Sequence, residues 1–110
     1  MVANYGGLLT PGMAPPMEML PSIADAVRGR VPILIDGSLR RGSDSFKALT
    51  FGATAVMIAR PIAWGLAAYG PEGAQQVLEM LQTKVVRYMA NTGKPTLKDI
   101  DLAVVKLHEV

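Results

Sequence analysis

The sequence predicts an α/β fold with parallel strands that forms one piece of a larger domain. Two short, mainly apolar stretches, 31–36 and 54–58, are each followed by a turn, which is typical of buried parallel strands. Helical patterns lie before, between and after these runs, as in right-handed β/α units. Two strands cannot close a barrel, and a (β/α)8 barrel needs about 250 residues.

The first part of the chain predicts a loop and then a helix. Residues 10–16 contain three prolines and a glycine, which exclude regular helix there. Residues 17–28 are expected to be helical and to end near Gly29. Their apolar face comprises Met17, Leu20, Ile23, Ala24 and Val27. Pro21 interrupts this pattern and leaves a second possibility, in which the helix begins at Pro21 after a turn.

The two predicted strands enclose a short helix. Residues 31–35 form an apolar run with β-branched residues at alternate positions, so we expect 31–36 to be a strand buried on both faces. Ser43 is a suitable N-cap for a helix that ends near Gly52. Residues 54–58 then form the second buried strand.

Two more helices are expected after the second strand. The first covers 62–69, in which Trp64 and Tyr69 are interpreted as packing residues. The second covers 71–91, because Pro71 suits a first turn and Gly93 follows the end. Its predicted buried stripe is Val77, Leu81, Val85 and Met89, with Leu78 and Met80 beside it. Residues 96–100 predict a capped turn, and the apolar tail is ambiguous.

Composition limits the function classes. The 110 residues allow one domain, and half of them are hydrophobic, which is enough for a packed core. A net charge of +2 without a basic stripe argues against nucleic acid as the main partner. Cysteine is absent and His108 is the only histidine, so disulfides, a histidine-based metal cluster and a Ser-His-Asp triad are excluded.

Location follows from similar exclusions. No apolar run approaches the roughly 18 residues of a membrane span, and the N-terminus lacks a signal-peptide pattern. The chain does not end in a peroxisomal Ser-Lys-Leu tripeptide. We therefore expect a cytoplasmic protein without a membrane span.

The carboxyl end of the first strand carries the most informative motif. Asp36, Gly37 and Ser38 are followed by Arg40 and Arg41. The glycine lets a ligand approach the backbone, and exposed N–H groups with a guanidinium suit an anion, most often a phosphate. The other interpretation is a strand, a tight turn and two solvated arginines. The second strand also ends beside a basic residue, in Ala59-Arg60-Pro61.

The segment VPILIDGSLRRGSDSFKALTFGATAVMIARPIAWGLAAYGPEGAQQVL resembles the C-terminal portion of the FMN-dependent 2-hydroxy-acid oxidases and dehydrogenases, which include glycolate oxidase, lactate oxidase and mandelate dehydrogenase. The resemblance extends through RYMANTGKPTLKDI and back to VANYGGLLTPG. It implies that residues 1–110 are one partial domain, about three units of a TIM (β/α)8 barrel. Residues 1–4 would be the stub of strand six, 31–36 strand seven and 54–58 strand eight, followed by the C-terminal helix.

The resemblance also implies FMN as cofactor, with its phosphate held after strands seven and eight. Carried over by position, the cofactor-binding residues are Asp36, Gly37, Ser38, Arg40, Ala59 and Arg60. The family usually has glycine at the positions of Ser38 and Ala59. A side chain there places a Cβ where the backbone meets the ligand.

The catalytic positions depart from the family pattern. Tyr5 stands where the family has its catalytic histidine, and a phenol is a poor base at neutral pH. Leu8 stands where an arginine grips the substrate carboxylate, and Pro11 replaces an aspartate. No catalytic residue can therefore be assigned, and the chain alone is expected to be inactive.

Three functional hypotheses follow. The first is a segment of an FMN-dependent enzyme that oxidises a small 2-hydroxy acid to a 2-oxo acid and is completed by a missing N-terminal barrel segment. The second is a non-catalytic, degenerate half-barrel that binds a phosphate or flavin ligand or forms a homo-oligomer through its strand edges. The third is a phosphate-binding barrel of other chemistry, like inosine-monophosphate dehydrogenase or isopentenyl isomerase.

Overall fold

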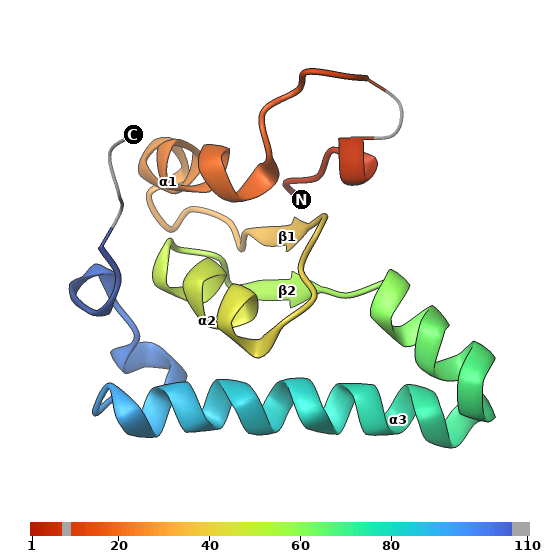
Figure 1. Cartoon of the computed structure of the whole chain (residues 1–110). Helices are drawn as coiled ribbons and strands as arrows, with labels where there is room; N and C mark the ends of the chain where they lie inside the picture. The colour runs from red at the N-terminus through yellow and green to blue at the C-terminus, as the bar shows by residue number, and fades with distance from the viewer. Residues whose placement is uncertain (8–9, 107–110) are drawn as a thin grey trace.

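The computed structural model describes residues 1–7 and 10–106. Its main elements, in chain order, are helix α1 (Pro16–Val27), strand β1 (Leu34–Asp36), helix α2 (Gly42–Thr50), strand β2 (Ala55–Met57) and helix α3 (Arg60–Asn91). Three short 3-10 turns complete the described chain, at Tyr5–Gly7, Leu97–Asp99 and Leu102–Val104. The alternation of helices and strands predicted from the sequence is confirmed (Figure 1).

The strands form a small parallel sheet. β1 pairs with β2 in parallel, with Ile35 opposite Val56 and Asp36 opposite Met57. On the other side of β1, Val2 makes a parallel bridge to Ile35. The Val2 N–H donates to the Leu34 carbonyl at 2.7 Å, and the Asp36 N–H donates to the Val2 carbonyl at 2.9 Å. β1 is therefore central, between an N-terminal stub and β2.

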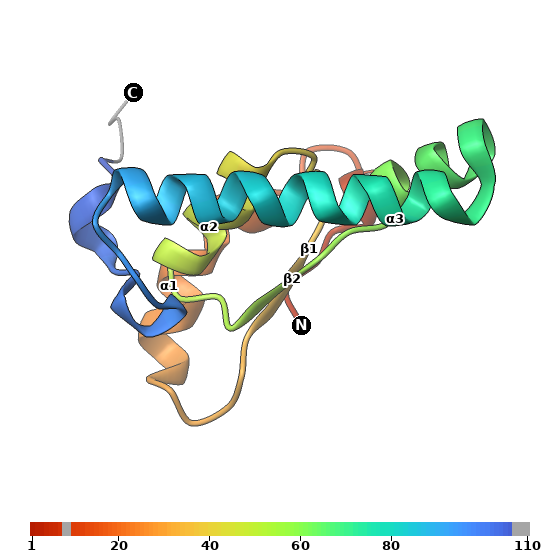
Figure 2. The same ribbon diagram turned by 90° about the horizontal axis from the view of Figure 1, so that it is seen from below.

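The described residues cover only one face of this sheet. Ile33 and Ile35 are buried in the core with Leu20 of α1 and Ala48 of α2, whereas Leu34 is 38% exposed. The prediction of buried strands was wrong for both strands, because β2 likewise exposes Ala55 and Met57 and leaves Val56 only partly buried. Figure 2 shows why, since α1 and α2 lie on the same side of the strands and no described helix covers the opposite side. The ordered strand is also shorter than the apolar run, and Val31 is exposed.

Helix α1 begins before Pro21, not at it. Pro16 occupies the first helical position, where its missing N–H costs nothing. Leu20, completely buried, anchors the turn that precedes Pro21. The other four residues of the predicted apolar face pack partly buried against the same core. Burial of this face holds the helix together around the proline.

Helix α2 begins two residues earlier than the sequence predicts. Its N-cap is Arg41 rather than Ser43. The capping carboxylate is that of Asp44, which accepts hydrogen bonds from the N–H groups of Arg40 at 3.1 Å and Arg41 at 2.9 Å. This pair of bonds fixes the backbone that follows the central strand, and thereby the base of the Arg40 side chain.

Helix α3 consists of two segments with a kink at Tyr69 and Gly70, which have non-helical backbone angles. The predicted division into two helices near residue 70 is thus confirmed. The long second segment packs against α2 (Figures 1 and 2). Leu81 is buried, and the other three members of the predicted stripe are half-buried. Leu78 and Met80 are about half exposed, because they lie on other faces of the helix.

The predicted capped turn is present at Leu97–Asp99. The Asp99 carboxylate accepts hydrogen bonds from the Thr96 hydroxyl and N–H, and these bonds lower the pKa of Asp99. The Asp101 carboxylate pairs with Lys94 at 2.9 Å, which lowers the pKa of Asp101. None of the helices in the described part of the chain combines the length and apolar character that a membrane span requires.

Candidate functional site

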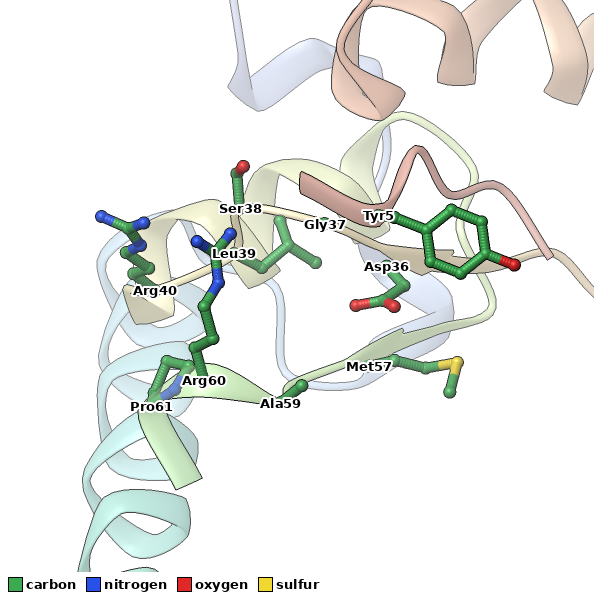
Figure 3. A pocket seen from close by; sticks show the side chains of 10 residues that line it. All are labelled: Tyr5, Asp36, Gly37, Ser38, Leu39, Arg40, Met57, Ala59, Arg60 and Pro61. Atoms are coloured by element: carbon green, nitrogen blue, oxygen red, sulfur yellow. The ribbon is translucent and has the colours of Figure 1, made fainter. Parts of the chain in front are cut away.

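A pocket of about 400 Å3 opens at the carboxyl ends of the two strands, beside the start of α3 (Figure 3). Its lining comes from the loop after β1, the residues around the end of β2, and the N-terminal 3-10 turn. The lining residues are Tyr5, Asp36, Gly37, Ser38, Leu39, Arg40, Met57, Ala59, Arg60 and Pro61. All six residues predicted to bind the cofactor are among them.

The register of the sheet explains this gathering. Asp36 and Met57 are the last paired residues of β1 and β2, so both strands release their loops at the same edge. The carboxyl ends of parallel strands are where open α/β folds bind their ligands. Residues more than 20 positions apart in the sequence are thereby brought to one pocket.

The backbone at the base of the pocket is unusual. Gly37 has φ of 114°, and Ser38 has φ of 61°. A Cβ on Gly37 would lie 3.1 Å from the Asn4 Oδ1 atom and 3.2 Å from the Pro16 Cγ atom, so only glycine fits without a shift. Ser38 adopts the left-handed conformation although it carries a Cβ, which is strained for an L-residue.

We expect Ser38→Gly to stabilise the chain by about 0.5–1 kcal/mol, because glycine adopts a positive φ without strain. Ala59→Gly is the matched control, since Ala59 has φ of −111° and gains nothing from glycine. Urea unfolding followed by circular dichroism measures both. Equal effects of the two substitutions would show that the Ser38 backbone is not strained.

Two arginines lie at one end of the pocket and Tyr5 at the other, with Asp36 between them (Figure 3). Within residues 1–7 and 10–106, the only ion pair is Lys94–Asp101, so no described carboxylate forms an ion pair with Arg40 or Arg60. The N–H groups of Ser38 and Leu39 donate no hydrogen bond to another described residue. This end of the pocket therefore offers two cations to an anion, next to two backbone N–H groups that other described residues do not use.

Tyr5 lines the pocket and is 70% exposed, with φ of 52°. Leu8 and His108 lie outside the described residues. Trp64 and Tyr69 were predicted to be packing residues, but they are 53% and 76% exposed.

Sequence reasoning missed the pocket residues Leu39, Met57 and Pro61, and the contact of Trp64 with Arg40. The Arg40 Cζ atom lies 5.4 Å from the Trp64 ring centroid. The spacing of Trp64 four residues after Arg60 could have predicted that both share one helix face.

Sequence comparison adds the family context. The sequence model of the FMN-dependent dehydrogenase family matches residues 1–107. The chain is 44% identical to a 2-hydroxyacid oxidase of Dictyostelium discoideum over 96% of its length, and 42% identical to human 2-hydroxyacid oxidase 1 over 96%. A peroxisomal (S)-2-hydroxyacid oxidase of Arabidopsis thaliana is 45% identical over 91% of the chain. These matches cover 27%, 29% and 28% of the three relatives.

Solved structures give the same picture. A mandelate oxidase variant with (S)-mandelic acid superposes with a TM-score of 0.92 at 39% identity, over 99% of this chain and 32% of that one. A mandelate oxidase variant with a monooxide FMN adduct gives 0.85 at 41% identity, over 88% and 31%. The chain thus spans less than a third of the length of the relatives to which it is similar.

Proposed function

Because the chain belongs to the FMN-dependent dehydrogenase family, we propose that it is the C-terminal segment of a 2-hydroxy-acid oxidase or dehydrogenase and carries the FMN phosphate site. The observation that carries this proposal is the convergence of Arg40, Arg60 and the Ser38 backbone on one pocket at the strand ends. By position, the Val2 stub, β1 and β2 would be strands six, seven and eight of a TIM barrel.

The chemistry of the pocket suits FMN in two ways. Two guanidinium groups and nearby amide donors match the charge and the acceptor oxygens of a terminal phosphate. Asp36 is half-buried between the arginines and Tyr5. Its carboxylate would repel a phosphate, but it would accept hydrogen bonds from the hydroxyl groups of a ligand. FMN carries hydroxyl groups next to its phosphate. Gly37, Ser38 and Ala59 would bring the backbone close to these groups.

We assign no catalytic residue to this chain. The bound flavin would accept the hydride equivalent from the α-carbon of a small 2-hydroxy acid, and the protein would orient both molecules. Tyr5 stands at the position of the family's histidine base and Leu8 at that of its substrate arginine. The chain alone is therefore proposed to be inactive, and a segment equivalent to the rest of the barrel would complete the site.

The open sheet supports such a partner segment. Leu34 and Met57 expose apolar side chains on the uncovered face, and no strand among residues 1–7 and 10–106 pairs with the outer edges of the Val2 stub and β2. Closed barrels remove such edges, which otherwise pair with other chains. The proposed partner is the N-terminal barrel segment, with self-association into a homo-oligomer as the alternative. A cytoplasmic location remains part of this proposal.

The alternative function is a non-catalytic half-barrel that keeps a phosphate or flavin site. The specific observation in its favour is Tyr5, a largely exposed phenol at the position of the catalytic base. Both functions share the phosphate site. They differ in whether the chain, combined with an N-terminal segment from a relative, oxidises a 2-hydroxy acid.

Binding of FMN to the purified chain tests the shared site. We expect flavin fluorescence titration to give a dissociation constant that Arg40→Ala raises about 10- to 30-fold, because the variant loses a charge-assisted hydrogen bond worth about 1.5–2 kcal/mol. Arg41→Ala is the matched control, since Arg41 is exposed beside Arg40 but does not line the pocket. It removes the same charge from the neighbouring position.

Two results would contradict this site. Equal loss of affinity in the Arg40 and Arg41 variants would mean that general positive charge, not the pocket, attracts FMN. No binding at high FMN concentration would mean that this chain does not assemble the phosphate site alone.

A further inference from the structure

Trp64, the only tryptophan of the chain, lies against a pocket residue without lining the pocket itself. It stands on the first segment of α3, four residues after Arg60, and so on the same side of that helix. The Arg40 Cζ atom lies 5.4 Å from its ring centroid, within the range of a cation–π contact. Trp64 thus connects the arginine of one strand end with the helix that carries the other.

Burial does not explain this residue. Its side chain is 53% exposed, and it belongs neither to the buried core nor to the partly buried residues packed against it. The one aromatic or cation–π contact of Trp64 in the described part of the chain is with Arg40. About half of this residue therefore remains exposed to solvent, and the Arg40 guanidinium is its one cation–π partner among the described residues.

The contact with Trp64 restricts an Arg40 side chain that has no ion pair among the described residues. The backbone N–H of Arg40 is held by the Asp44 carboxylate at 3.1 Å, but its exposed side chain has no ion-pair partner among the described residues. A long arginine side chain loses much rotamer freedom when it binds a ligand. A guanidinium stacked on a ring uses its face for the contact and keeps its in-plane N–H donors for a phosphate.

We propose that Trp64 is a positioning residue, which holds the Arg40 guanidinium at the rim of the pocket so that its N–H groups meet the ligand phosphate. This inference rests on the proposed phosphate site and deepens it. The indole restricts the arginine before the ligand arrives, so less freedom is lost on binding. Arg60 reaches the same end of the pocket from the preceding turn of α3 (Figure 3).

FMN titration of three variants tests the proposal. We expect Trp64→Leu to weaken FMN binding about two- to fivefold, the effect of an exposed cation–π contact, and Trp64→Phe to restore most of the affinity. Tyr69→Leu controls for the loss of an exposed aromatic from the same helix. In an Arg40→Ala background, Trp64→Leu should have no further effect, because Trp64 acts through that arginine.

The fluorescence of the single tryptophan gives a second readout that needs no flavin. Arg40→Ala should shift the Trp64 emission of the free chain, whereas Arg41→Ala should not. Inorganic phosphate, which does not absorb the emitted light, should change this emission in the wild type and leave it unchanged in Arg40→Ala.

The outcomes separate this inference from the proposed function. If Arg40→Ala weakens FMN binding but Trp64→Leu does not, or if Trp64→Leu costs the same in both backgrounds, the positioning role is wrong and the phosphate site stands. If neither FMN nor inorganic phosphate binds, the site and the positioning role fall together, even where Arg40→Ala still shifts the emission.

Discussion

Ile35→Ala should remove about 2–5 kcal/mol from the free energy of unfolding. Ile35 is completely buried in the central strand, where truncation loses apolar burial and leaves a cavity. A domain of this size is stable by only about 5–15 kcal/mol, so the loss is a large fraction of the total. Because Asp36, Gly37 and Ser38 follow directly, the same substitution should also weaken phosphate binding. Urea unfolding followed by circular dichroism measures the first effect.

Leu34→Ala is the matched control. Leu34 precedes Ile35 in the same strand but faces the uncovered side and is 38% exposed. Its truncation in the isolated chain should cost less than about 1 kcal/mol, since little apolar surface is lost from the core. Equal losses at the two positions would mean that both faces of the sheet are covered in solution, for example by a second copy of the chain. Sedimentation of the wild type would then reveal that copy.

The contrast between Leu34 and Ile35 also shows what the sequence could not predict. The apolar run 31–35 predicts burial on both faces, as in a complete parallel sheet. The structure buries Ile33 and Ile35 beneath α1 and α2 but leaves Leu34 exposed. The local hydrophobic pattern shows which faces of a strand are apolar. It does not show whether the elements that would cover those faces belong to the same chain.

The pocket was predictable because its geometry follows from strand order. Adjacent parallel strands end at one edge, so the DGSLR segment at the end of β1 and the Ala59-Arg60 pair after β2 had to meet there. The contact of Trp64 with Arg40 was not predictable in the same way. It depends on the angle between β2 and the start of α3, and the hydrophobic periodicity of the sequence does not predict that angle.

The placement of the first segment of α3 depends on Gly65, and substitution of this glycine is the second change for which we expect a large effect. Gly65→Val should destabilise the chain by about 3 kcal/mol, although glycine within a helix is normally improved by substitution. The kink at Tyr69 and Gly70 folds the first segment of α3 back along the second, so that Gly65 and Gly73 are both buried in close contact. A Cβ on Gly65 would lie 2.5 Å from the Gly73 carbonyl oxygen, and backbone atoms cannot move aside cheaply.

The functional consequence distinguishes this substitution from a simple loss of stability. Arg60 and Trp64 both belong to the first segment of α3, which packs through Gly65, so forcing the two halves of α3 apart should displace Arg60 from the pocket and Trp64 from Arg40. We expect FMN affinity to fall even under conditions in which the variant is fully folded. Ala67→Val adds the same side chain at an exposed position of that segment and should change neither property. A stabilised Gly65→Val chain would show that the two halves are not in contact in solution, and unchanged FMN affinity would show that the start of α3 does not position the phosphate site.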